Sequence, residues 1–183
     1  MITIRFATPE DAPALLAIYA PYITDSIISF EYEVPDLADF TGRIEAIRQQ
    51  FPYLVAESEG RLLGYAYAAR HNERSAYQWS ANTSVYIHQD WHRRGIARTL
   101  YARLLDLLRA QGYCNAFAGI TLPNEKSEAF HQSMGFERIG TYSNTGFKFG
   151  AWHSVAWFQL VLQPYPPSPA PPVPIGALAL KSA

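Results

Sequence analysis

The sequence has little cysteine, little charge and no long hydrophobic run, and each shortage excludes a class of protein. Its single cysteine, Cys114, cannot form an internal disulfide framework, which fits a reducing compartment. The formal net charge of −1 argues against a general nucleic-acid-binding protein, which would be strongly basic. No apolar run approaches the roughly 20 residues that a membrane-spanning helix needs. Neither a nucleic-acid partner nor a membrane partner is therefore expected.

The composition predicts one domain with a substantial core, because 49% of the 183 residues are apolar and 14% are aromatic. The first residues, MITIRFATPED, lack the basic start and the apolar stretch of a signal peptide, so a cytoplasmic location is expected. The composition changes at Pro164, where a tail of residues 164–183 begins.

The tail contains seven prolines, which exclude a helix or a central strand across that stretch. Polyproline II structure or disorder is expected instead. The predicted division is therefore a domain of residues 1–163 followed by a proline-rich tail. Three apolar residues of the tail, Ile175, Leu178 and Leu180, could dock on the domain.

The stretch from Ser84 to Leu108, SVYIHQDWHRRGIARTLYARLLDLL, is the most informative part of the chain. Residues 84–87 are β-branched and aromatic with a period of two, which is typical of a strand. From Ile96 onward, apolar residues recur at helical spacing, which predicts an amphipathic helix. The loop between them is basic and contains Gly95. Because the first turn of a helix has unpaired N–H groups and a positive dipole end, this unit predicts an anion-binding cradle.

Two common phosphate motifs are missing from this loop. No Lys-Ser/Thr pair follows a glycine as in the P-loop, and the dinucleotide pattern GxGxxG is absent. An ordinary strand–loop–helix unit with solvated arginines is the alternative. The clustering of Arg93, Arg94 and Arg98 favours a local anionic ligand over a long polyanion.

Hydrophobic periodicity and turn residues predict the remaining elements. Strands are expected at residues 3–7, 53–57, 62–69, 77–87, 113–121, 136–142 and 147–162. Helices are expected from Thr8 to near Pro21, from Pro35 through Ile47, from Gly95 to Gly112 and from Pro123 through Met134. Residues 27–32 are either a short strand or a loop over a cleft.

Residues 92–97, HRRGIA, follow a Val-Tyr-Ile strand and resemble the acyl-CoA signature of the GCN5-related N-acetyltransferases (GNAT), Q/R-x-x-G-x-G/A. His92 takes the first position of this signature and Ala97 the last. The order of elements over about residues 2–162 is also similar to that family. The resemblance implies an α/β (α+β) fold with a mixed, mostly antiparallel central sheet of about six to seven strands. The sheet would be splayed at the acyl-CoA site and flanked by about four helices.

Several segments resemble the phosphinothricin N-acetyltransferase-like subgroup of this family. They are FEYEVP (30–35), RSAYQW (74–79), LPNEKS (122–127), His131 with MGF (134–136), and FKFGAWH (147–153). The subgroup acetylates the α-amine of small amino acids or toxic analogues such as phosphinothricin and methionine sulfoximine. The resemblance therefore implies an enzyme with acetyl-CoA as co-substrate, a small-molecule amine as acceptor and no metal. It also implies a homodimer, because members are commonly dimers.

The resemblance assigns acetyl-CoA to the signature loop and to the strand before it. Main-chain N–H groups would hold the pyrophosphate at Arg93, Arg94, Gly95, Ile96, Ala97 and Arg98. The pantetheine would pair like an extra strand with Val85, Tyr86 and Ile87, and an N–H near Tyr86 or Ile87 would polarise the thioester carbonyl. Asn124 would bind the pantetheine or the adenosine-side phosphates, although it is equally a good helix N-cap.

Acetyl transfer also requires groups that move protons, and here the sequence departs from the subgroup. The subgroup's proposed base, a glutamate, is replaced by Asn82, which cannot take a proton, and an assisting histidine is replaced by Phe149. A water relayed by Asn82, Thr83 or Ser84 could serve instead. Glu31 and Glu33 are fallback bases, although solvated loop carboxylates are the simpler interpretation.

His131 takes the position of a tyrosine in related acetyltransferases. It would protonate the leaving thiolate or bind near the sulfur, and a purely structural role is equally expected. Arg74, with Arg70 as a second choice, could clamp an acceptor carboxylate or phosphinate bidentately. The acceptor pocket would be lined by Asn82, Thr83 and aromatic side chains that could equally be core: Phe30, Tyr32, Tyr77, Trp79 and Phe149.

Two alternatives remain open. The same fold could act on a polyamine, an aminoglycoside or a protein N-terminus, against which the arginines at positions 70 and 74 argue weakly. The chain could also be a non-catalytic acetyl-CoA-binding module that has lost its base, which Asn82 supports.

Overall fold

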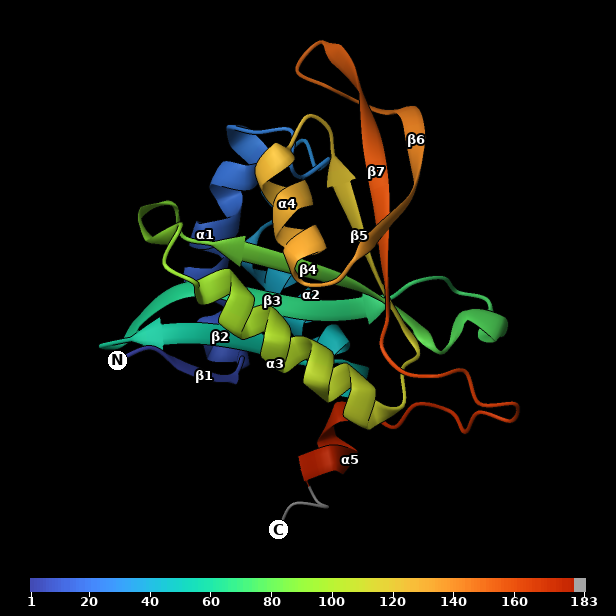
Figure 1. Ribbon diagram of the computed structural model, residues 1–183. Coiled ribbons are helices and arrows are strands. Elements are labelled where there is room, and N and C mark those ends of the chain that lie inside the picture. Colours follow the sequence, from blue (N-terminus) through green and yellow to red (C-terminus); the bar gives the residue numbers. More distant parts are fainter. Residues whose placement is uncertain (180–183) are drawn as a thin grey trace.

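The computed structural model describes residues 1–179, which form a seven-stranded sheet with helices on both faces (Figure 1). The strands are β1 (Thr3–Phe6), β2 (Tyr53–Ser58), β3 (Arg61–Arg70), β4 (Ser80–Ile87), β5 (Asn115–Thr121), β6 (Glu137–Lys148) and β7 (Ala151–Val161). The helices are α1 (Ala12–Thr24), α2 (Leu37–Gln50), α3 (Ile96–Gln111), α4 (Glu125–Ser133) and α5 (Ile175–Ala179). Short 3-10 turns lie at Pro9–Asp11, Ser75–Tyr77 and Gln89–Trp91.

The strand order is β1-β2-β3-β4-β5-β7-β6, and every neighbouring pair is antiparallel except β4 and β5. These two strands run parallel and pair only from Ser80 with Asn115 to Asn82 with Phe117. Beyond that point they diverge like the arms of a V, which we call the β4–β5 split (Figure 1). The expected mixed, mostly antiparallel and splayed sheet is confirmed, with seven strands.

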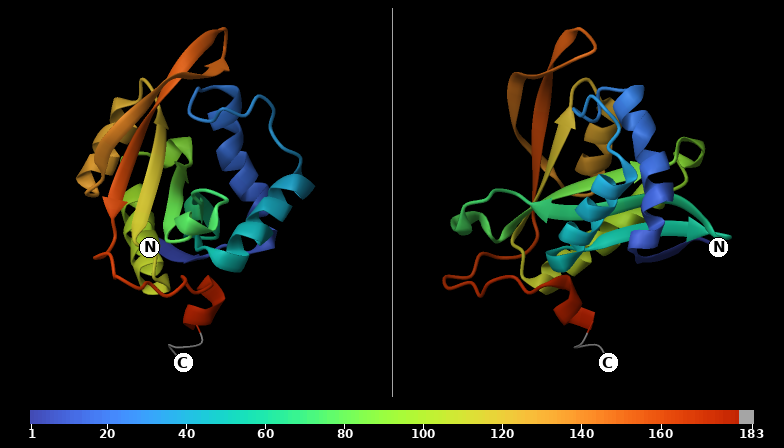
Figure 2. Two further views of the ribbon diagram at one scale, coloured as in Figure 1. Left: turned by 90° about the vertical axis from the view of Figure 1, so that its right-hand side faces the viewer. Right: turned by 180° about the vertical axis from the view of Figure 1, so that it is seen from behind.

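Different helices cover the two faces of the sheet. On one face α3 packs through Leu100 and Leu104, which are completely buried together with Ala116 of β5. On the opposite face α1 and α2 pack through Leu15 and Ile44. Figure 2 shows α1 and α2 in front of the sheet when the molecule is seen from behind. A ligand in the split therefore meets different helices on its two sides.

Helix α1 continues past Pro21, where the sequence predicted its end. A proline inside a helix costs about 3 kcal/mol because it lacks an N–H and clashes with the preceding turn. The last turn is kept because it makes tertiary contacts. Ile23 is completely buried, and the Tyr22 hydroxyl donates to the main-chain oxygen of Ile87 at 2.6 Å. The extra turn thereby brings α1 to the end of β4.

The turn between the last two strands lies at Phe149 and Gly150, whereas the sequence predicted it between residues 142 and 147. Both residues have positive φ angles, 50° and 75°, as in a tight type I′ hairpin turn. Residues 143–145 instead form an irregularity in β6, where the register with β7 shifts and Asn144 has a φ of 48°. The long hairpin projects beyond the rest of the sheet, at the top of Figure 1.

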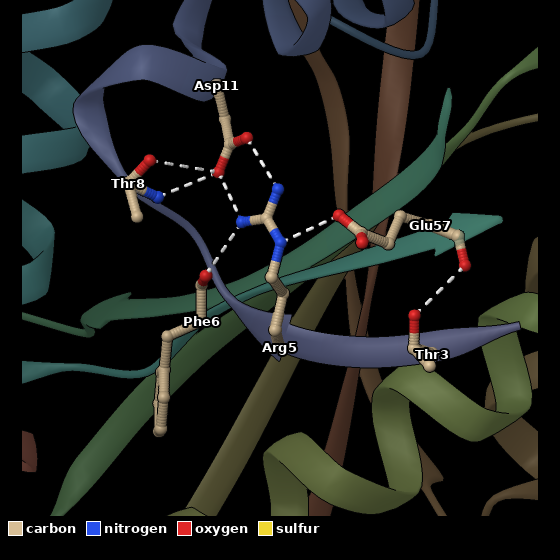
Figure 3. A network of polar contacts seen from close by, with 6 residues as sticks. All are labelled: Thr3, Arg5, Phe6, Thr8, Asp11 and Glu57. Atoms are coloured by element: carbon tan, nitrogen blue, oxygen red, sulfur yellow. Dashed lines mark hydrogen bonds and ion pairs between the residues drawn. The ribbon is translucent and has the colours of Figure 1, made fainter. Parts of the chain in front are cut away.

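The edge strand β1 is fastened by a charged network around Arg5 (Figure 3). The guanidinium of Arg5 donates to both carboxylate oxygens of Asp11, at 2.7 and 2.8 Å, and to Glu57 at 2.7 Å. Asp11 also accepts from the Thr8 N–H at 2.8 Å, which completes a capping box at the entry to α1. The neighbouring guanidinium lowers the pKa of the Asp11 carboxyl. The network joins β1, the first helical turn and β2.

The proline-rich segment lies against the domain. Residues 164–174 have no regular structure, but Gln111, at the end of α3, donates its side-chain amide to their main chain at 2.7 Å. The prediction that the tail holds no helix is wrong for α5, which begins directly after the last proline, Pro174. Ile175 of α5 is buried in the core and Leu178 packs against it, as the sequence suggested for both. Leu180, the third apolar residue named for docking, lies outside the described residues.

Lys148, the last residue of β6, is only 2% exposed. Its ammonium donates to three main-chain oxygens in the last turn of α1 and the following loop, those of Ile23 (2.7 Å), Ser26 (3.0 Å) and Ser29 (2.6 Å). Carbonyl groups at a helix C-terminus carry partial negative charge and attract a cation. Burial lowers the pKa of Lys148, and the charge of Glu31 opposes that shift. Lys148 thus clasps the β6–β7 hairpin to the α1–α2 loop.

Replacing Lys148 with methionine should lower the free energy of unfolding by about 3 kcal/mol, because each buried carbonyl left without a donor costs about 1–3 kcal/mol. Urea unfolding followed by circular dichroism measures the change. The matched control is Lys126→Met at an exposed position of α4, where a change within about 0.5 kcal/mol is expected. Equal stabilities of the two variants would contradict the clasp.

Candidate active site

The basic loop between β4 and α3 leads to a helix end with free amides. Arg93 and Gly95 have φ angles of 61° and 77°. A Cβ at Gly95 would meet no atom within 4 Å, so glycine is favoured there by the backbone conformation and not by crowding. The first amides of α3, at Ile96, Ala97 and Arg98, have no carbonyl partner within the helix, and no side chain caps this end. The loop and these amides form the predicted anion-binding cradle.

Two other helices, α2 and α4, have side-chain caps at their starts. At the start of α2, Asp36 accepts from the N–H of Asp39 at 2.8 Å. At the start of α4, Asn124 accepts from the N–H of Ser127 at 3.2 Å. Asn124 is therefore a helix cap, and its side-chain nitrogen is the group that remains for a ligand.

Two of the three clustered arginines, Arg94 of the loop and Arg98 of α3, contact other side chains of the protein. The guanidinium of Arg94 lies over the ring of Trp91, 4.4 Å from its centroid. Arg98 donates to the hydroxyl of Ser133 in α4 at 2.7 Å. These contacts leave the main chain of the loop, together with the helix dipole, as the principal anion-binding surface.

The main-chain groups of β4 alternate between β3 and the split. Tyr65 pairs with Tyr86 across the ladder, and the N–H of His88 donates to the oxygen of Leu63 at 2.8 Å. In an antiparallel ladder every second residue directs its N–H and C=O to the same neighbour. The main chain of Tyr86 therefore faces β3. The prediction that Tyr86 contributes main-chain groups to the thioester or the pantetheine is wrong.

The neighbours of Tyr86, Val85 and Ile87, direct their main-chain groups into the split. Ile87 is engaged there, because its N–H donates to the Tyr22 hydroxyl at 3.2 Å and its oxygen accepts from Tyr22 and from Nε2 of His92, the latter at 3.0 Å. Burial raises the pKa of the Tyr22 hydroxyl. Of the three predicted pantetheine partners, Val85 is the one whose main chain faces the split and, within residues 1–179, makes no hydrogen bond to a side chain.

His131 is 5% exposed and lies inside the protein on α4. Its Nδ1 donates to the oxygen of Ser127 at 2.8 Å, so Nε2 of the neutral ring is an acceptor, 3.0 Å from the Tyr101 hydroxyl. That hydroxyl lies 2.9 Å from Oγ1 of Thr83, which is itself 3.1 Å from the oxygen of Phe117. Burial lowers the pKa of His131. His131 thus reaches the split through two buried hydroxyls.

Asn82 and Ser84 lie on the other face of β4, because side chains alternate along a strand. Ser84 lies beside Tyr67, where it opposes the rise in the pKa of the Tyr67 hydroxyl that burial causes. The Oδ1 atom of Asn82 lies 2.7 Å from Nδ1 of His71, whose ring stacks on Phe117 with 4.2 Å between centroids. The sequence predicted no role for His71, because a polar loop without a motif gives no sign of what it contacts.

The predicted acceptor-binding residues fall into two groups. The first joins the α1–α2 loop to the β6–β7 hairpin. The Tyr32 hydroxyl donates to the oxygen of Phe147, and the ring of Phe30 occupies the space that a Cβ on Gly146 would need. Phe149 is 62% exposed at the tip of the hairpin. This group therefore forms a wall of aromatic side chains.

The second group lies on the β3–β4 connection, which enters β4 at the closed end of the split. Arg70 pairs with Glu73 at 3.1 Å, whereas Arg74 has no ion pair among residues 1–179. The ring of Tyr77 lies 5.9 Å from that of His71. Figure 1 places this connection, at the right, away from the hairpin tip at the top. The chain thus does not bring the two groups together.

Two residues have other partners than the sequence suggested. Trp79 was a candidate for the pocket wall, but its Nε1 donates to the oxygen of Ala170 at 2.8 Å and so faces the tail segment. Glu31 is not a solvated loop carboxylate, because it accepts from Arg43 and from the Tyr19 hydroxyl, each at 2.9 Å. A carboxylate held in this way is a poor candidate for a base.

Other chemistries find no support in the described residues. Across residues 1–179, no three His, Cys, Asp or Glu residues gather where they could hold a metal ion. In the same range no helix is long and apolar enough to cross a bilayer. Cys114 is buried, and burial raises the pKa of its thiol, which disfavours the nucleophilic thiolate.

Residues 4–157 hold the sheet, the cradle and α4, and they match a family model described as an acetyltransferase (GNAT) domain. This chain belongs to the GNAT acetyltransferases. It is an N-acetyltransferase that uses acetyl-CoA, and the activity implied by the sequence resemblance is confirmed at this level.

Three relatives show where this acetyltransferase stands within the family. It is 36% identical to a phosphinothricin N-acetyltransferase of Streptomyces viridochromogenes, over 94% of each chain. It is 32% identical to an L-methionine sulfoximine/L-methionine sulfone acetyltransferase of Pseudomonas paraeruginosa, over 88% of this chain and 95% of the relative. A crystal structure of a phosphinothricin acetyltransferase from Sinorhizobium meliloti in complex with acetyl-CoA superposes with a TM-score of 0.87 and 29% identity, over 95% and 98% of the two chains.

Replacing Gly95 of the acetyltransferase with alanine should weaken CoA binding about tenfold. A non-glycine residue in a left-handed conformation costs roughly 1–2 kcal/mol, and 1.4 kcal/mol corresponds to a factor of about ten in affinity. Isothermal titration calorimetry with CoA measures the dissociation constant. The matched control is Gly42→Ala in α2, where a Cβ also meets nothing within 4 Å and alanine suits the helix. An unchanged dissociation constant in Gly95→Ala would argue against the cradle.

Proposed function

We propose that this enzyme acetylates the α-amine of a small amino acid or of an amino-acid analogue such as phosphinothricin or methionine sulfoximine. The observation that carries the proposal is that two relatives named for such acceptors match 94% and 88% of this chain. Aromatic side chains near the split support it, because they suit a small acceptor with an apolar side chain. An arginine without an ion pair on the β3–β4 connection, among residues 1–179, supports it separately, because it suits a carboxylate.

The acetyl donor fits the α3 side of the split. The amides of Ile96, Ala97 and Arg98 supply donors for a diphosphate without a compensating side chain. The main chain of Val85 faces the split and can pair with an amide of the pantetheine as a further strand would. The side-chain nitrogen of Asn124 can donate to a pantetheine or phosphate oxygen while its oxygen caps α4.

The reaction at the thioester requires stabilisation of an oxyanion and protonation of sulfur. The N–H groups of Val85 and Ile87 face the split, but that of Ile87 donates to the Tyr22 hydroxyl, so the N–H of Val85 would polarise the thioester oxygen. Thr83 is the residue of the buried hydroxyl chain that lies at the split. For His131 to supply the proton of the leaving thiolate, its ring must first be an imidazolium, whose Nε2–H would donate to Tyr101 and so to Thr83.

The acceptor would approach from the other face, because α3 and α4 cover the donor side. The wall of Phe30, Tyr32 and Phe149 lies at the hairpin, away from the β3–β4 connection that carries Arg74, so one small acceptor would not contact both (Figure 1). Arg74 would bind its carboxylate, since a guanidinium without an ion pair can form two parallel hydrogen bonds to a carboxylate. Glu31 would not bind the acceptor amine, because Arg43 already neutralises the Glu31 carboxylate.

We also propose that the enzyme is a homodimer formed through the β6–β7 hairpin. Four large aromatic side chains of this hairpin are exposed by 46–63%: Tyr142, Phe147, Phe149 and Trp152. The edge strand β6 also leaves one side of its main chain unpaired within residues 1–179. Exposed apolar surface beside a free strand edge is typical of a protein–protein interface.

The acceptor class can be tested by following thiol release from acetyl-CoA. We expect methionine sulfoximine or phosphinothricin to give a kcat/KM at least about tenfold above that of spermidine, an aminoglycoside or a peptide, because only the former match an arginine clamp and a small aromatic pocket. The N-acetylated form of the best acceptor, which lacks a free amine, is the substrate control.

In the same assay Arg74→Ala should raise KM for the amino-acid acceptor about tenfold and leave KM for acetyl-CoA unchanged. Arg70→Ala is the matched control, because Glu73 already occupies that guanidinium. Preference for a polyamine, or no acetylation of any amine, would overturn the proposed acceptor.

Light scattering of the purified protein should give twice the 20.6 kDa mass of one chain. Trp152→Glu on the hairpin should shift the mass to that of a monomer, because a charge in an apolar interface is costly to desolvate. Ile2→Glu, an exposed apolar position at the other edge of the sheet, should leave the dimer intact. A monomeric unmodified protein would refute the dimer.

A further inference from the structure

A histidine and an asparagine meet at the point where β4 and β5 part. His71 follows the last residue of β3, and Nδ1 of its ring lies 2.7 Å from Oδ1 of Asn82. Asn82 pairs with Phe117 in the last position at which the two strands are joined. The pair therefore lies at the closed end of the split, on the face opposite α3.

Aromatic side chains hold the ring of His71 in one orientation. It stacks on Phe117 at 4.2 Å with an angle of 20° between the ring planes. The ring of Trp157 meets it at 88° and 6.1 Å, and that of Tyr77 lies 5.9 Å away. His71 is partly buried in this setting. A ring packed on three sides loses little further freedom when a substrate arrives.

The hydrogen bond fixes which nitrogen of His71 can take a proton. An amide oxygen can only accept, so Nδ1 carries the hydrogen that Asn82 Oδ1 receives. The lone pair then remains on Nε2, which makes no hydrogen bond within residues 1–179. Histidine is the side chain that gains and loses a proton near neutral pH, and an asparagine orients the catalytic histidine in papain-like proteases.

We propose that His71 is the proton acceptor of this acetyltransferase and that Asn82 orients it. Asn82 takes the position at which the family resemblance implies a glutamate base, and His71 supplies a basic group on the adjoining loop. The proposal rests on the amine acceptor proposed above. In this assignment His71 is catalytic, and Asn82 is a positioning residue that acts through it.

The step balances as follows. An N–H bond of the acceptor ammonium breaks, and Nε2 of His71 takes the proton and becomes part of an imidazolium. The free amine adds to the thioester carbonyl, forming a C–N bond, and the C–S bond then breaks. The nitrogen loses a second proton, which balances the proton that the thiolate gains to leave as CoA thiol. His71 returns its own proton to water, so the net products are the amide, CoA and one proton.

The first test is His71→Phe, which keeps a ring of similar shape on Phe117 but removes both nitrogens. With the best acceptor of the screen, kcat at pH 7 should fall about 100-fold or more, while the dissociation constant for CoA stays within twofold. Glu73→Gln, on the same loop, is the matched control and should keep kcat within twofold. A kcat for His71→Phe equal to that of the unmodified enzyme would overturn the proposal.

Two rescue experiments separate a proton acceptor from a packing residue. Imidazole in solution should restore kcat of His71→Ala at least tenfold and should not accelerate the unmodified enzyme or Glu73→Gln. Adding Asn82→Glu to His71→Phe should also restore kcat at least tenfold, because it returns a carboxylate to β4. If CoA binding is intact and neither rescue occurs, His71 is not the base.

Asn82→Ala tests the positioning role separately. It should lower kcat about tenfold with KM for both substrates within twofold, because the ring keeps its basic nitrogen but loses its orientation. The His71 experiments and the acceptor screen can fail independently of each other. A polyamine acceptor with a His71-dependent rate would overturn the proposed acceptor alone, and an amino-acid acceptor with a His71-independent rate would overturn the proposed base alone.

Discussion

The site depends on the parting of β4 and β5 after only three residue pairs. Two strands that diverge leave a row of main-chain donors and acceptors, and these must find other partners. At the narrow end the Thr83 hydroxyl lies against the oxygen of Phe117, and at the wide end the Tyr22 hydroxyl holds both main-chain groups of Ile87. Val85, between them, keeps its main chain toward the split. The opening is thus closed at both ends and suits one extended segment in the middle.

Because side chains alternate along β4, the split has two faces with different chemistry. Toward α3 lies a buried chain of hydroxyl and imidazole groups, formed by Thr83, Tyr101 and His131. Toward α1 and α2 lie the His71–Asn82 pair and the aromatic rings around it. Donor and acceptor can therefore reach one carbonyl from opposite sides without competing for the same groups. In the proposed reaction, β4 would separate the proton that reaches sulfur from the proton that leaves nitrogen.

The local part of this arrangement could be predicted from the sequence. The strand–loop–helix unit, Gly95 and the order of elements depend on short-range patterns, and the structure has them where the patterns indicate. Periodicity along β4 could not show which set of main-chain groups faces the split, so Tyr86 was named together with Val85 and Ile87, although only the latter two face it.

Long-range contacts account for the other omissions. Lysine is rarely buried, and nothing near Lys148 in the sequence indicates that three carbonyls more than a hundred residues away surround it. His71 and Asn82 meet only because the β3–β4 connection folds back onto the sheet. Nor could composition show that Glu31 pairs with Arg43, or that Trp79 donates a hydrogen bond to the tail segment.

The change from a glutamate to Asn82 alters how the site can recognise an amine. A carboxylate base attracts an ammonium and holds it as an ion pair, so it contributes to binding as well as to proton transfer. A neutral histidine–asparagine pair provides no such attraction. Proton transfer to it moves the positive charge from the ammonium to the imidazole, whereas transfer to a carboxylate neutralises both groups. Among residues 1–179, Glu31 near this face is already paired with Arg43. Under the proposed mechanism an acceptor would be held through another of its groups, and the carboxylate of an amino acid, bound by a guanidinium such as that of Arg74, would meet this requirement where a polyamine would not.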